Sequence, residues 1–152
     1  MKRPLSIHII LFCFLLGCNN QPSNEKRAVE PTVTQGKSCI DSVMKQDSLL
    51  GEKRNTDSRQ VPLSQAIRDY TVGIENINFA SCPPAFTTAF QKHKEAWTAM
   101  TTVTDQYPAI RGELHELFQQ LEKSNHAAEF KQHLRAVNDT WTAVEKASQT
   151  TQ

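Results

Sequence analysis

Two groups of histidine and glutamate side chains have the chemistry to hold a divalent metal. His126, Glu129 and His133 follow each other at spacings of three and four residues, which places them on one helix face. The second group consists of Glu113, His115 and Glu116. A di-iron bundle site needs ordered Glu-x-x-His pairs, and the sequence contains none. We therefore interpret both groups as charged surface that faces water.

His93 is a second candidate for chemistry. It falls on an apolar helix stripe, four residues before Trp97, so we expect it to be at least partly buried. A buried imidazole needs a hydrogen-bond partner, and a backbone carbonyl or a neighbouring hydroxyl would serve. The alternative is that His93 is a haem or metal ligand, with Met44 or Met100 across the bundle.

The residues Leu15-Leu16-Gly17-Cys18 end an apolar run of about twelve residues, which follows the cationic Lys2 and Arg3. This order is that of a secretory signal, and the last four residues resemble the lipobox of bacterial lipoprotein precursors. A transmembrane helix is the alternative, but it would need roughly 20 apolar residues. The resemblance implies that residues 1–17 are removed and that Cys18 carries diacylglycerol and an acylated amino group.

The lipoprotein resemblance also implies a location. Each buried CH₂ contributes about 0.8 kcal/mol, so several acyl chains anchor a protein almost permanently. In this family, aspartate after the lipidated cysteine favours the inner membrane, and here that position is Asn19. We therefore expect a lipid anchor in the outer membrane, with the protein facing the periplasm; exposure on the outer leaflet is the alternative.

Cys39 and Cys82 remain once Cys13 leaves with the signal peptide and Cys18 carries lipid. An even pair in an oxidising compartment predicts a disulfide. Closing a loop of roughly 44 residues would stabilise the fold by about 4 kcal/mol through chain entropy. Two buried thiols are the alternative, and the absence of Cys-x-x-Cys speaks against a redox or zinc pair.

Motifs for catalysis are absent from the sequence. It contains no Gly-x-Ser-x-Gly, no His-Glu-x-x-His and no glycine-rich phosphate loop. We therefore expect no catalytic residues, no cofactor and no enzymatic activity.

The charge balance argues against nucleic-acid binding. The net charge is +1, and it becomes −1 when Lys2 and Arg3 leave with the signal peptide. No basic stripe with interleaved aromatic residues is present. A near-neutral chain of this kind lacks the electrostatic footprint that binds phosphates.

Four segments repeat apolar residues at helical spacing, and no stretch alternates in the rhythm of a strand. They span residues 63–77, 86–100, 110–121 and 127–144. Pro62, Pro83-Pro84 and Pro108 precede three of them, where a helix tolerates proline. We predict an all-α fold in which the aromatic and leucine stripes form the core.

The connections between these segments are short, which favours antiparallel neighbours. We expect a small antiparallel bundle of three to four helices, with a shorter helix from about Ser38 to Leu50 pinned beside it by Cys39. The expected organisation is a signal peptide (1–17), a flexible tether (18–38), a short helix and loop (39–60) and the helical bundle (61–150).

One further segment carries a resemblance. The run Cys82-Pro83-Pro84-Ala85-Phe86, with His93 and Ala96-Trp97 after it, resembles part of a family of small uncharacterised exported bacterial proteins. Its marks are Cys-Pro-x-x-Phe at the start and His-x-x-Ala-Trp at the end. The resemblance implies an exported helical fold and no particular activity.

These observations favour a non-catalytic envelope lipoprotein that binds or helps to assemble another envelope protein. A haem- or metal-binding periplasmic bundle that uses His93 is the first alternative. The second alternative is a pilotin-like lipoprotein of a secretion system, which rests on architecture alone. An immunity or inhibitor protein that shields the envelope is also compatible with the sequence.

Overall fold

The computed structural model describes residues 32–149, and within that range the chain is helical and contains no strand. The helices are α1 (Val33–Asp57), α2 (Leu63–Glu75), α3 (Pro84–Thr104), α4 (Leu114–Leu121) and α5 (Ala127–Gln149). The all-α prediction is confirmed. The expected signal peptide, Cys18 and the first part of the tether lie outside the described residues.

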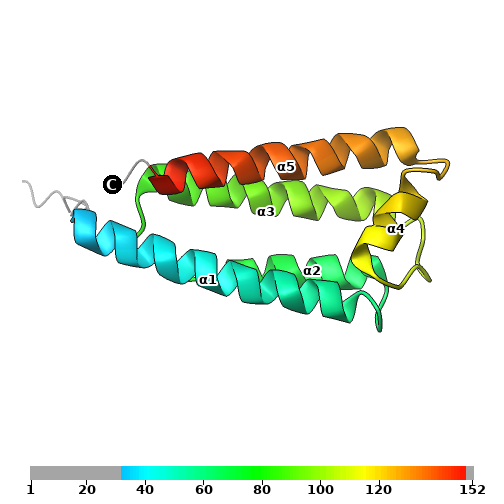
Figure 1. Ribbon diagram of the computed structural model, residues 1–152, viewed down its shortest axis with the longest axis horizontal. Coiled ribbons are helices and arrows are strands. Elements are labelled where there is room, and N and C mark those ends of the chain that lie inside the picture. Colours follow the sequence, from blue (N-terminus) through cyan, green and yellow to red (C-terminus); the bar gives the residue numbers. More distant parts are fainter. Residues whose placement is uncertain (1–31, 150–152) are drawn as a thin grey trace, which may run out of the picture.

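Helices α1, α3 and α5 run along the length of the molecule, the shorter α2 lies beside the second half of α1, and α4 lies at one end (Figure 1). The most extensive packing joins α3 to α5, while α2 packs on both α1 and α3. The domain can therefore be described as an α1–α2 pair and an α3–α5 pair that meet through α2 and α3. None of the described helices combines the length and apolar character needed to cross a bilayer.

The apolar stripes of α2, α3 and α5 form the core, as the sequence predicts. Its fully buried side chains include Ile67 and Ile74 of α2, Phe86 and Phe90 of α3, and Phe130 of α5. Burying a side chain of this size contributes roughly 1.5–3 kcal/mol. These stripes therefore fix which face of each helix points inward.

Helix α1 is longer than the short helix expected from Ser38 to Leu50. It begins inside the expected tether, where Thr32 and Gln35 form a capping box: the Gln35 amide donates to Thr32 Oγ1, and the Thr32 amide donates to Gln35 Oε1. It also continues through the expected loop as far as Asp57. Helix α1 is thus one of the main helices of the bundle and not a short helix beside it.

The helix in the third apolar segment, expected over residues 110–121, is shorter than predicted. It begins at Leu114, because backbone groups before it bond elsewhere: the Leu63 amide donates to the Ile110 carbonyl over 2.9 Å, and the Gly112 amide donates to the Ser58 carbonyl over 2.8 Å. The resulting α4 closes the end of the bundle through buried Leu117 and Leu121.

The predicted disulfide is confirmed at the opposite end from α4. Cys39 of α1 is bonded to Cys82, whose Cα lies 5.1 Å away in the turn that leads from α2 into α3. The disulfide therefore fixes the first turns of α1 to the turn that joins α2 and α3.

Replacing Cys39 and Cys82 together by serine should lower the free energy of unfolding by about 2–4 kcal/mol, because the unfolded chain loses a long covalent loop. Urea denaturation measures this. Dithiothreitol should lower the stability of the native protein to that of the double variant and leave the variant unchanged. Equal stability of the native and variant proteins would contradict the prediction.

Candidate functional site

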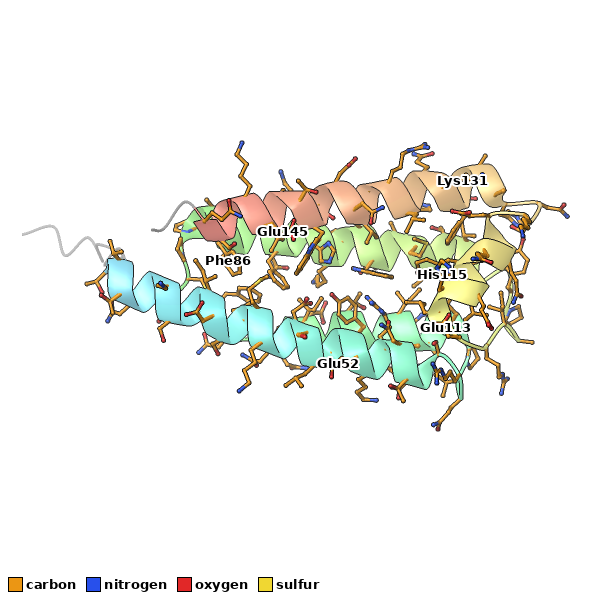
Figure 2. All side chains as sticks on the ribbon, in the orientation of Figure 1. Glu52, Phe86, Glu113, His115, Lys131 and Glu145 are labelled. Atoms are coloured by element: carbon orange, nitrogen blue, oxygen red, sulfur yellow. A yellow bond between two sulfur atoms is a disulfide. The ribbon has the colours of Figure 1, made fainter. Side chains whose placement is uncertain are left out.

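A polar and aromatic cluster interrupts the apolar core between the two helix pairs. In Figure 2 the side chains of the α1–α2 pair and of the α3–α5 pair point toward one another in this interior. The cluster consists of Asp47 and Arg54 from α1, Tyr70 from α2, His93 and Trp97 from α3, and Thr140 and Trp141 from α5. All four long helices contribute to it.

Asp47 is a buried carboxylate, with 8 % of its surface exposed. Tyr70 Oη donates a hydrogen bond to Asp47 Oδ1 over 2.6 Å. Burial raises the pKa of Asp47, while the Tyr70 bond and the charge of Arg54 oppose that rise. Burial and the charge of Asp47 both raise the pKa of Tyr70, so the phenol keeps its proton and remains the donor.

Arg54 lies across two aromatic rings. Its Cζ atom is 4.6 Å from the ring centroid of Tyr70 and 4.0 Å from that of Trp97, within the range of cation–π attraction. Nε and Nη2 donate to Asn55 Oδ1 over 3.2 and 3.1 Å. Burial lowers the pKa of Arg54, and Tyr70 and Asp47 oppose this; a guanidinium nevertheless remains a cation.

The hydrogen bonds of His93 define its protonation state. Trp97 Nε1, which can only donate, lies 3.1 Å from His93 Nε2, so Nε2 carries no proton. The proton of the neutral ring is then on Nδ1, which donates to Thr140 Oγ1 over 3.1 Å. Thr140 in turn donates to the Ala136 carbonyl over 2.7 Å. Burial, followed by the charge of Arg54, lowers the pKa of His93 to about 4, which agrees with a neutral ring.

A pocket of about 270 Å³ opens beside this cluster, between α1 and α5. Its walls include Asp47, Gly51 and Arg54 of α1, Tyr70 of α2, Trp97 of α3 and Trp141 of α5. We call it the α1/α5 pocket. It combines aromatic surface with one carboxylate, one guanidinium and the imidazole of His93, the composition expected of a small-ligand site.

Two other hollows differ in character. One, beside the disulfide, is lined by short polar side chains such as Ser38, Ser42 and Asn78. The other lies on the outer surface of α1 and α2, around Leu50 and Gly73. Neither is lined by an ionisable acid or base.

The other sequence candidates do not converge on one site. His126 Nδ1 bonds Tyr107 Oη over 2.9 Å, and His133 Nε2 lies 3.7 Å from Glu129 Oε1. Glu113 caps the start of α4. Within residues 32–149, no three histidine, cysteine, aspartate or glutamate side chains are placed to share a metal ion.

Sequence reasoning placed His93 correctly on a buried face but missed Asp47 and Arg54. It treated both as part of a polar helix and loop. The available signal was spacing: Ile40, Val43, Asp47 and Arg54 continue one helical stripe on α1, in which the last two positions are charged.

No protein-family model matches the chain, and no curated protein or solved structure matches it significantly.

His93 should make stability depend on pH. Its pKa is about 4 in the native protein and about 6.5 in an unfolded chain, so the unfolded state binds more protons between these values. The free energy of unfolding should therefore fall by about 2–3 kcal/mol as the pH drops from 7.5 to 4.5. This part of the loss should be absent from His93→Gln, which does not titrate and keeps an acceptor for Trp97.

Urea denaturation of the native and His93→Gln proteins at both pH values provides the measurement. The same pH dependence in both proteins would show that His93 is not held in its neutral form.

Proposed function

We propose that this protein is a non-catalytic binding protein, anchored by lipid at Cys18 in the outer membrane and facing the periplasm, and that its ligand enters the α1/α5 pocket. The observation that carries the proposal is the placement of Asp47 and Arg54 on one wall of an aromatic pocket. Desolvating such charges is costly, and apolar residues in their place often stabilise a protein. Contacts with the rings of Tyr70 and Trp97 compensate part of this cost within the protein, and contact with a ligand gives the two charges a functional role.

The anchor and the scaffold of this proposal have separate support. The lipobox resemblance supports lipidation at Cys18, and the Cys39–Cys82 disulfide fits an oxidising compartment. The scaffold is an antiparallel bundle, in agreement with the short connections between its helices. A tether before α1 would hold the bundle close to the membrane surface.

The bonding within the cluster favours binding over catalysis. A general base needs a lone pair within reach of the substrate, but the Nε2 lone pair of His93 accepts from Trp97. Asp47 is bonded to Tyr70, whose phenol holds its proton. These groups are arranged to stay in one protonation state, which suits a fixed recognition surface.

The hydrogen bonds of His93 also argue against the alternative that it binds haem or a metal. A ligand bond from His93 would have to replace its hydrogen bond with Trp97 or with Thr140. The pocket volume of about 270 Å³ also lies below the roughly 300–1,000 Å³ of sites for drug-sized ligands. The geometry therefore favours a ligand smaller than haem.

Filling the pocket should abolish ligand binding without unfolding the protein. Gly51→Leu places a good helix former on the pocket wall, whereas Glu52→Leu adds the same side chain at the next position of α1, outside the pocket lining (Figure 2). A panel of small metabolites should contain a compound that raises the melting temperature of the native protein and of Glu52→Leu, but not of Gly51→Leu.

The panel is scored by thermal denaturation and by tryptophan fluorescence. If no compound distinguishes the native protein from Gly51→Leu, the pocket does not have the proposed role.

A second candidate function is binding of another envelope protein, for which a different surface provides the observation. Leu49 and Val72 are 57 % and 54 % exposed, and they lie on α1 and α2. A hollow of about 240 Å³ is lined by Leu49, Leu50, Gly73 and Ile77, together with the polar Gln46 and Asn76. We propose that this apolar surface contacts an apolar face of a protein partner. A pilotin-like or an immunity role would be a specific form of this candidate.

Photo-crosslinking in whole cells tests this second candidate. A benzophenone amino acid at Val72 should give one discrete product with a single envelope protein, because an interface presents the same neighbour each time. The same probe at the exposed Lys92 on α3 serves as the control. Identical products from both positions, or none from Val72, would contradict a specific interface.

A further inference from the structure

The α1 wall of the pocket has an unusual order of side chains. Asp47, Gly51 and Arg54 lie at spacings of four and three residues, so they share one helix face. An acid and a base thus stand on the same wall with a residue that has no side chain between them. Along α1 the wall therefore presents a negative charge at Asp47, an open space at Gly51 and a positive charge at Arg54.

Packing does not explain the glycine at position 51. Glycine within a helix is less stable than alanine, yet a Cβ atom added to Gly51 would meet only Arg54 Nη2, at 3.9 Å. Gly73 differs, because its added Cβ atom would lie 2.4 Å from Leu50 Cδ2. Gly73 allows close contact between α1 and α2, whereas Gly51 leaves space in the pocket.

The position of the guanidinium sets the distance between the two charges. Arg54 Nη2 lies beside Gly51, and Gly51 is about one helical turn, or roughly 5.4 Å, from Asp47. A ligand that joins the two must therefore carry its own charges close together. An α-amino acid meets this condition, because its ammonium and carboxylate groups are attached to the same carbon.

Charge balance restricts the net charge of the ligand. Asp47 and Arg54 neutralise one another, so a ligand with a net charge would leave one charge buried without compensation. A zwitterion adds one charge of each sign and leaves the pocket neutral. The rest of the lining consists of the rings of Tyr70, Trp97 and Trp141 together with Ser48, His93, Val137 and Asn138. Its aromatic part favours a flat apolar body.

We propose that the α1/α5 pocket binds a free α-amino acid with an apolar or aromatic side chain. Its carboxylate is held by Arg54, its ammonium by Asp47, and its side chain by the ring of Trp141, because Arg54 already covers the ring of Trp97. This inference rests on the proposed binding function, and it names the ligand class. The volume of about 270 Å³ favours a single amino acid over a peptide, whose terminal charges are also farther apart.

The protein contains a reporter for this test. Its two tryptophans, Trp97 and Trp141, both line the pocket. L-phenylalanine should therefore cause a saturable change in tryptophan fluorescence. Phenylalaninamide, which lacks the carboxylate, and N-acetylphenylalanine, which lacks the ammonium group, should each bind at least about tenfold more weakly, because each leaves a buried charge unpaired.

Variants separate recognition from stability. Gly51→Ala should raise the melting temperature, because alanine favours the helix, and should weaken phenylalanine binding several-fold, because the methyl group enters the pocket. Arg54→Gln should lose the preference for phenylalanine over phenylalaninamide. Asp47→Asn should lose the preference for phenylalanine over N-acetylphenylalanine. A purely structural role would not produce these two opposite changes in selectivity.

The outcomes distinguish this inference from the proposed function. If either blocked analogue binds the native protein as tightly as phenylalanine, the inference that the pocket requires a zwitterion is wrong, although the pocket still binds a ligand. If the dipeptide Phe-Phe binds more tightly than phenylalanine, the inference that the ligand is a single amino acid is wrong. If no amino acid binds but another metabolite does, only the ligand class fails; if nothing binds in the pocket, both proposals fail.

Discussion

A buried carboxylate governs how the four long helices meet. Asp47 is 8 % exposed, and a carboxylate is stable at such depth only with close partners. Tyr70 supplies a hydrogen bond from α2, and Arg54 supplies the opposite charge from α1. Arg54 lies over Trp97 of α3, and Trp97 bonds His93, whose partner is on α5. These contacts, which join all four long helices, begin with the need to compensate the charge of Asp47.

Covalent and backbone bonds at the two ends hold the walls of the α1/α5 pocket in place. At one end the Cys39–Cys82 disulfide fixes α1 to the turn before α3. At the other end, backbone bonds join Ser58 to Gly112 and Leu63 to Ile110. Because α1 packs on α2 and α5 packs on α3, the pocket between α1 and α5 is framed by helices that have other partners. The shape of the pocket therefore rests on contacts made within the protein.

The sequence was sufficient for the features that rest on apolar pattern and on cysteine count. These include the helices that carry the core, the Cys39–Cys82 pair and the buried, hydrogen-bonded His93. It was insufficient where charged residues occupy inward positions. Asp47 and Arg54 interrupt the apolar stripe of α1 and resemble solvent-exposed residues in a pattern, so the helix was expected to be short and the site was not found. Only the contacts with other helices distinguish a buried charge from a surface one.

The central claim is that the α1/α5 pocket holds an α-amino acid between Asp47 and Arg54. The most direct measurement is a two-dimensional ¹H–¹⁵N spectrum of the labelled protein during titration with L-phenylalanine. The indole signals of Trp97 and Trp141 should both shift and saturate at the same concentration, because both rings line the pocket. Indole signals that remain unchanged at millimolar phenylalanine would contradict the claim.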